Sequence, residues 1–223
     1  MQSPAQVDRG STLARLIMSA VSENIVREYF ELHGFLVRQH RKYVGQTRRD
    51  DDDIDFFILN PRPQLKTAAL PFVLSSADLP MVERAIVVVK GWHTETFGTA
   101  RLTNSPAIFR FVEPRVFHRA MKAFGPDGEP LKILIVPSLP HSAQAKTDTI
   151  ALLRSKGIDA VIPFRTLLAD LVKTTDVNRN FQKSDLLQII RILKTYDFFK
   201  EPQLELFKQK RRQAKSEARP PKS

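Results

Sequence analysis

The chain has 223 residues, of which 42% are hydrophobic, so it is long enough and apolar enough to bury an ordinary core. It contains no cysteine, which excludes disulfides and thiolate metal sites. The formal net charge of +11 at pH 7 favours a polyanionic partner.

The two ends of the chain differ in composition from its centre. Residues 1–10 contain Pro4 and Gly10 and predict a flexible leader without the apolar core of a signal peptide. No apolar run approaches the ~20 residues that a membrane-spanning helix needs, so we expect a cytoplasmic protein with no membrane partner. Residues 201–223 form a basic tail, for which two interpretations remain open: a solvated disordered end or an arm that binds nucleic acid.

The first half of the chain predicts one long helix followed by strands. From Ser11 to Leu32 apolar residues recur every three or four positions, and Gly34 is typical of a helix end. Three segments then have strand patterns: 35–43, with one basic face, 54–59 and 84–90. Residues 64–81 indicate an excursion with at most a short strand, and 91–114 form a long connection that we expect to cover a site.

The second half alternates helices and strands. We expect a helix at 115–124 and a strand at 131–136. A helix then begins at Thr147 or Asp148 as its cap and ends before Gly157. A strand at 160–164 and helices at 164–171 and 186–196 follow, and Ser184 caps the last helix. This order predicts an α/β domain over residues 11–200, with a central mixed β-sheet flanked by helices.

Lys90 is the first functional candidate, because a lysine directly after five apolar residues is costly unless it is paired or used. If the strands at 54–59 and 84–90 are neighbours, Asp55 and Lys90 can meet at one end of the sheet. A carboxylate and an ammonium there could bind a hard cation and stabilise charge on a phosphate. A structural ion pair is the alternative.

Three segments carry a family resemblance: Ser22-Glu-Asn-Ile-Val-Arg-Glu-Tyr-Phe-Glu-Leu-His-Gly-Phe35, Asp53-Ile-Asp-Phe-Phe-Ile58 and Val87-Val-Val-Lys90. In this order they resemble the PD-(D/E)xK nuclease superfamily, and most of all its archaeal Holliday-junction-resolvase type. The similarity covers roughly residues 20–92. It implies a restriction-endonuclease-like fold and, as in resolvase-type members, a homodimer.

The resemblance also assigns roles. It makes Asp55 the metal-binding carboxylate, Lys90 the residue that orients or activates the attacking water, and Glu23 the helix carboxylate that completes the site. In the superfamily one or two Mg²⁺ ions generate the nucleophile and neutralise the phosphate. The family's second acidic ligand lies two residues before the lysine, where this chain has Val88.

Three explanations of Val88 remain open. A carboxylate has moved, with Glu95, Asp53 or Glu23 as candidates, and the chain is an active Mg²⁺- or Mn²⁺-dependent endonuclease. Alternatively, and as our leading interpretation, the chain is a non-cutting relative that kept the fold and binds nucleic acid, with DNA favoured over RNA. Thirdly, the chain lies outside the superfamily, and Asp55 and Lys90 form a structural pair. For function, a non-catalytic protein-interaction scaffold without a nucleic-acid partner is a further alternative.

Further candidates surround the acidic strand. The hairpin before it carries five basic residues that could contact phosphates, and the alternative is a merely soluble edge strand: Arg38, Arg41, Lys42, Arg48 and Arg49. Trp92 could stack on a base or pack over the sheet. His93 and Glu95 form a possible two-ligand metal unit, although a His-x-Glu pair is common by chance.

Overall fold

The computed structural model describes residues 9–39, 54–64, 69–125 and 128–199. The chain divides into two compact units, Met1–Thr174 and Thr175–Ser223, so the predicted domain of residues 11–200 covers most of the first unit and part of the second. The predicted basic tail lies outside the described residues. Within the ranges that are described, no helix is both long and apolar enough to cross a bilayer.

A five-stranded mixed sheet forms the centre of the first unit. Its strands lie side by side in chain order: β1 (Leu36–Gln39), β2 (Phe56–Leu59), β3 (Arg84–Val89), β4 (Leu131–Val136) and β5 (Ala160–Pro163). β2 is antiparallel to β1 and to β3, whereas β3, β4 and β5 are parallel. The α/β class and the mixed sheet that the sequence predicts are confirmed.

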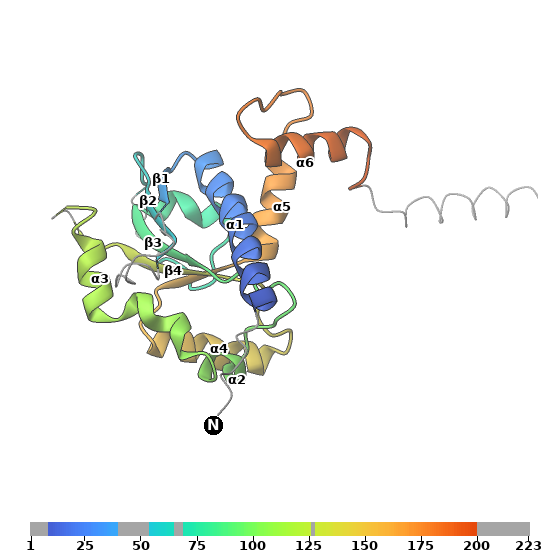
Figure 1. Cartoon of the computed structure of the whole chain (residues 1–223). Helices are drawn as coiled ribbons and strands as arrows, with labels where there is room; N and C mark the ends of the chain where they lie inside the picture. Colours follow the sequence, from blue (N-terminus) through green and yellow to red (C-terminus); the bar gives the residue numbers. More distant parts are fainter. Residues whose placement is uncertain (1–8, 40–53, 65–68, 126–127, 200–223) are drawn as a thin grey trace, which may run out of the picture. The chain divides into compact units, whose positions relative to one another are not determined.

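Helices cover both faces of this sheet (Figure 1). One face carries α1 (Arg9–Leu32) and α5 (Phe164–Thr174), which contact each other; α1 also contacts β1 and β3, and α5 contacts β5. The other carries α2 (Thr99–Thr103), α3 (Pro114–Met121) and α4 (Ala143–Ser155), whose apolar side chains share one core cluster with the sheet. Because β3 to β5 are covered on both sides, their sequences are apolar almost throughout.

One sequence-based prediction of local structure needs correction, and one segment that the sequence left unassigned contains helices. The helix α4 begins at Ala143, after Ser142, and not at Thr147 or Asp148. The Thr147 hydroxyl instead donates to the carbonyl of Ala143 at 3.0 Å, as a threonine inside a helix can. The segment 91–114, which the sequence left unassigned, contains α2 and the 3₁₀ helix η3 (Pro106–Val112).

The predicted excursion between β2 and β3 protects a sheet edge. Val73 forms a parallel bridge with Val161 of β5, and the 3₁₀ helix η2 (Ser76–Met81) follows. Leu74 N donates to the carbonyl of Val161 at 2.9 Å, and Val161 N donates to the carbonyl of Phe72 at 2.7 Å. This short pairing covers main-chain groups of β5 that an edge strand would otherwise expose.

The C-terminal half of α1 is fixed by buried polar contacts. The Tyr29 hydroxyl lies 2.9 Å from Ser76 Oγ, and burial raises the pKa of this phenol. His33 Nε2 lies 2.6 Å from Asp170 Oδ2 of α5. Gly34 follows with φ +82°, and the predicted helix end there is confirmed. These contacts hold α1 against the sheet face.

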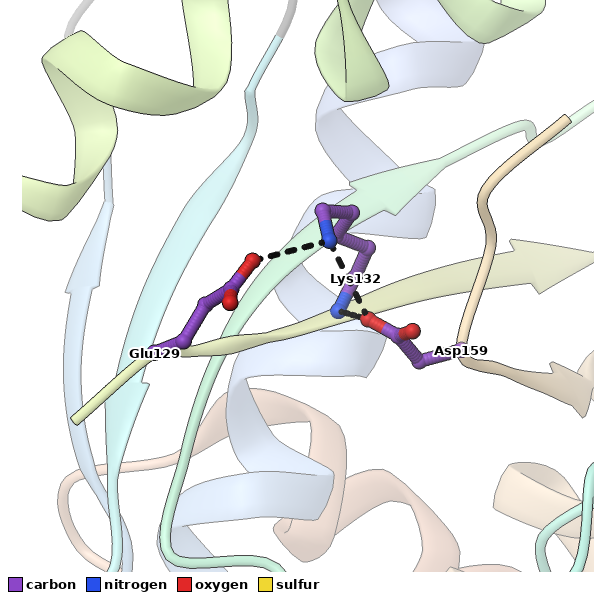
Figure 2. A network of polar contacts seen from close by, with 3 residues as sticks. All are labelled: Glu129, Lys132 and Asp159. Carbon is purple, nitrogen blue, oxygen red and sulfur yellow. Dashed lines mark hydrogen bonds and ion pairs between the residues drawn. The ribbon is translucent and has the colours of Figure 1, made fainter. Parts of the chain in front are cut away.

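A lysine network ties β4 to the turn before β5 (Figure 2). Lys132 Nζ lies 3.3 Å from Glu129 Oε1 and 3.7 Å from Asp159 Oδ2. Lys132 N donates to Asp159 Oδ2 at 2.7 Å, and Asp159 N donates to the Lys132 carbonyl at 3.0 Å. The same ammonium lies 4.0 Å from the centroid of the Phe117 ring, so Lys132 connects β4 with Glu129, Asp159 and α3.

The second unit contains α6 (Asp185–Thr195). The Ser184 hydroxyl accepts a hydrogen bond from Leu187 N at 3.2 Å, which confirms Ser184 as the predicted cap. Arg191 and Lys194 donate to the carbonyls of Val177 and Thr175, which fixes the chain that leads into the helix.

Candidate functional site

The strand directions bring two of the predicted site residues, Asp55 and Lys90, to one end of the sheet. β1 and β3 both end there, and β2 begins there because it runs the opposite way. Gln39 closes β1, Asp55 precedes β2 and Lys90 follows β3. The carboxyl ends of β4 and β5 lie at the same edge, which is where open α/β sheets bind their ligands.

Asp55 is a buried carboxylate with a main-chain partner. Its side chain is 4% exposed, and its Oδ2 accepts a hydrogen bond from Val89 N at 2.7 Å. Its own amide donates to the Val87 carbonyl at 3.1 Å. The carboxylate thus takes the place of a main-chain acceptor where the β2–β3 ladder ends, and one of its oxygens is committed to that bond.

Lys90 continues the pairing of β3 with β4 by one residue. Its amide donates to the Ile135 carbonyl at 3.0 Å, and the residue is half-buried. Val88, by contrast, is fully buried in the core cluster that also contains Phe97 and Phe117. The position where the family has an acidic ligand is therefore part of the hydrophobic core in this chain.

Glu23 reaches the same edge from α1. Gln39 Nε2 of β1 donates to Glu23 Oε2 at 2.8 Å, so the helix carboxylate lies beside the carboxyl end of β1. Its neighbour Ser22 is 1% exposed, and Ser22 Oγ lies 3.0 Å from Nε2 of His93. The helix therefore contributes two polar side chains to the edge where Asp55 and Lys90 lie.

Glu95 and Trp92 both pair with Arg101. Glu95 Oε2 lies 3.4 Å from Arg101 Nε, and the guanidinium carbon lies 4.7 Å from the centroid of the Trp92 ring. Trp92 also packs against Phe97, with ring centroids 5.7 Å apart. In this arrangement the carboxylate of the His-x-Glu pair has its own cation, and His93 has a different partner.

One of the predicted phosphate-contacting residues is described. Arg38 of β1 lies with its guanidinium carbon 6.0 Å from the centroid of the Phe57 ring. Together with Arg84 and Phe124 it lines a groove of about 370 Å³ beside β1 and β2. The other basic residues of the hairpin, and the metal-ligand candidate Asp53, lie outside the described residues: Arg41, Lys42, Arg48 and Arg49.

The described side chains do not form a ready-made Mg²⁺ site. Among them, no three His, Cys, Asp or Glu residues are grouped as metal ligands would be. Each described acidic candidate has a partner in the protein: the Val89 amide for Asp55, Gln39 for Glu23 and Arg101 for Glu95. Because this donor set does not fit Mg²⁺, we derive no chemical step through a metal.

Comparison with protein-family models, curated proteins and solved structures finds no match. The resemblance to the PD-(D/E)xK superfamily therefore depends on the residues quoted above and on the order of the elements. That order, a long helix, three antiparallel strands, a helical crossover and a parallel strand, is described by the structure itself.

Sequence reasoning missed two contacts at this edge. The bond from Val89 N to Asp55 depends on a side chain replacing a main-chain acceptor, and no sequence pattern signals such a replacement. The contact between Ser22 and His93 joins residues 71 positions apart. Its one local signal is Gly91, since a glycine directly after a strand often marks a close approach of another segment.

Proposed function

We propose that this chain binds nucleic acid, DNA in preference to RNA, through a nuclease-like centre that is incomplete as a metal-dependent phosphodiesterase. The observation that carries the proposal is that Glu23, Asp55 and Lys90, from three separate elements, all lie at the carboxyl edge of the sheet. The resemblance assigns catalytic roles to the same three residues. The net charge of +11 supports a polyanionic partner.

We call the centre incomplete because of what the structure shows at three positions considered as acidic ligands: 88, 95 and 55. Val88 is buried in the core and cannot serve as a ligand, and the carboxylate of Glu95 pairs with Arg101. Asp55 keeps its carboxylate but has one oxygen bonded to the main chain. A centre with these features retains a lysine for phosphate binding, and among the described residues Val88 leaves it without the acidic ligand two positions before that lysine.

A mobility-shift experiment at low salt tests the proposal with duplex, branched and single-stranded DNA and with RNA of the same sequence. We expect binding that weakens steeply as salt increases, because cationic side chains displace counterions from the phosphates. Absence of affinity for all four would contradict the proposal. Equal or tighter binding of RNA would contradict the preference for DNA.

An active Mg²⁺- or Mn²⁺-dependent endonuclease is the second candidate. The position of Glu23, Asp55 and Lys90, to which the resemblance gives catalytic roles, at one edge of the sheet favours it, and Asp53 is the candidate for the additional carboxylate. Incubation of labelled DNA with each metal separates the two candidates. Metal-dependent nicking that disappears in Lys90→Ala protein would establish cleavage, whereas nicking that persists in that variant would come from a contaminant.

A further inference from the structure

His93 is held in one orientation at the edge where the candidate site lies. Its Nε2 atom lies 3.0 Å from the hydroxyl of Ser22, a side chain that is almost fully buried on α1. The edge of its ring meets Phe164, with centroids 4.5 Å apart and planes at 80°. Its amide donates to the carbonyl of Gly91 at 3.0 Å, so the chain turns back directly after Lys90.

The contact between Ser22 and His93 leaves no room for a side chain at Gly91. A Cβ atom on Gly91 would lie 2.3 Å from Ser22 Oγ and 3.6 Å from His93 Nε2. Any larger residue would push the hydroxyl or the imidazole away. Three segments, α1, the turn after β3 and the start of α5, therefore combine to place a single imidazole.

One nitrogen of the His93 imidazole, Nδ1, is available for a further contact. His93 is exposed although its Nε2 is bonded to a buried hydroxyl. Within the part of the chain that the structure describes, its Nδ1 atom has no hydrogen-bond partner. Either atom can be the donor in the contact between Ser22 Oγ and His93 Nε2; in the tautomer in which the hydroxyl donates, the ring proton resides on Nδ1, which is then a donor. Phosphate oxygens are acceptors for such a donor.

We infer that His93 contacts a backbone phosphate of the bound nucleic acid through Nδ1, and that Ser22 positions its ring. The inference rests on the proposed function and adds to it a residue to which the family resemblance gives no role. The ligand class is the phosphodiester, because the edge that holds this imidazole also holds Lys90. His93 thus supplies a phosphate contact at a centre that has lost an acidic ligand.

Two substitutions of similar size distinguish a phosphate contact from a structural one. The amide nitrogen of asparagine lies at the δ position and donates, like Nδ1–H, whereas the amide oxygen of glutamine lies at the ε position and accepts, as Nε2 does from Ser22. His93→Asn should therefore keep a donor for the phosphate and lose Ser22, and His93→Gln should do the reverse. We expect His93→Gln and His93→Ala to weaken duplex binding about fivefold, the factor that one ordinary hydrogen bond contributes, and His93→Asn to weaken it less.

The remaining variants complete the series. Ser22→Ala should weaken binding about twofold, because the ring loses its orientation but keeps its donor. His118→Ala, at an exposed histidine on α3, is the matched control and should leave affinity unchanged. If His93→Gln binds like the native chain while His93→Asn does not, the bond to Ser22 matters only for structure and the inference is wrong.

The direct experiment follows the imidazole nitrogens by NMR while a short duplex is added to the full chain. We expect the Nδ1 resonance of His93 to shift as the duplex saturates, with the resonances of His118 unchanged. If the duplex binds in the mobility-shift experiment and the His93 resonances do not move, this inference is wrong and the proposed function stands. If no duplex binds at all, both are wrong.

Discussion

Two lysines at opposite ends of the parallel strands differ in their surroundings. Lys132, at the amino end of β4, lies between Glu129, Asp159 and the ring of Phe117, and its main chain is bonded to Asp159 in both directions (Figure 2). Lys90, at the carboxyl end of β3, lies at an edge that receives side chains from α1, from the start of β2 and from the turn after β3.

The comparison shows that a lysine at the end of a buried strand does not by itself indicate function. At the amino end, the polar groups satisfy one another and clamp β4 to the turn before β5. At the carboxyl end, buried groups such as Ser22 and Asp55 instead orient other parts of the edge, and the exposed His93 keeps an open nitrogen. We therefore assign a structural role to the first end and propose ligand binding at the second.

The largest expected effect concerns the position where the family has an acidic ligand. Val88→Glu would place a carboxylate in the core beside Phe97 and Phe117, so it should lower the free energy of unfolding by more than about 3 kcal/mol. Val88→Thr keeps the shape and should cost about 1 to 3 kcal/mol. Urea denaturation measures both. A Val88→Glu protein of native stability would mean that this position faces the site.

The second effect compares two contributions of Asp55 to stability: the hydrogen bond that it accepts and its negative charge. Asp55→Ala leaves the buried Val89 N–H without its acceptor and should destabilise the fold by about 2 to 3 kcal/mol. Asp55→Asn keeps an oxygen at this position and should destabilise it less. Denaturation curves give both values. Equal losses for the two variants would show that the negative charge, and not the acceptor, is what the fold uses.

The third effect tests how closely α1 approaches the turn after β3. Gly91→Ala would bring a Cβ within 2.3 Å of Ser22 Oγ and should cost about 1 to 2 kcal/mol of stability. Gly98→Ala is the matched control, because its Cβ would meet no atom closer than Pro140 Cγ at 3.7 Å. Thermal denaturation compares the two. A Gly91→Ala protein as stable as its control would contradict the close packing at this edge.

The smallest expected effect on stability concerns Lys132, at the amino end of β4. Lys132→Ala removes ion pairs to the partly exposed carboxylates of Glu129 and Asp159, together with the contact to the Phe117 ring. We expect a loss of about 1 kcal/mol, because solvent screens such pairs. Denaturation of the variant checks this value. A much larger loss would make the clamp a principal source of stability.

Much of the fold could be predicted from the sequence, because its elements carry strong local signals. The strand at 131–136 has the predicted bounds, since a continuous apolar run is bounded by turn residues. Ser184 and Gly34 delimit helices as expected because their side chain or conformation satisfies main-chain groups there. The start of α4 was missed because Thr147 and Asp148 resemble caps but lie inside the helix.

The candidate site was predictable only in part. Strand direction alone brings Asp55 and Lys90 to one edge of the sheet, as the sequence predicts, whereas their roles stay a prediction. Their partners depend on packing between distant segments: Val89 for Asp55, Gln39 for Glu23 and Ser22 for His93. A sequence does not specify such distances, so the contact between His93 and Ser22 could not be predicted from it.

The most direct test of the central claim compares Lys90→Ala with Lys132→Ala in duplex binding at low salt. Each variant removes one lysine from one end of the same sheet, and each must first be shown to be folded by circular dichroism. We predict that Lys90→Ala weakens binding about fivefold or more, as the loss of a charged phosphate contact should, and that Lys132→Ala leaves it unchanged. Equal affinities for the two variants, or a larger loss in Lys132→Ala, would contradict the assignment of ligand binding to the carboxyl end.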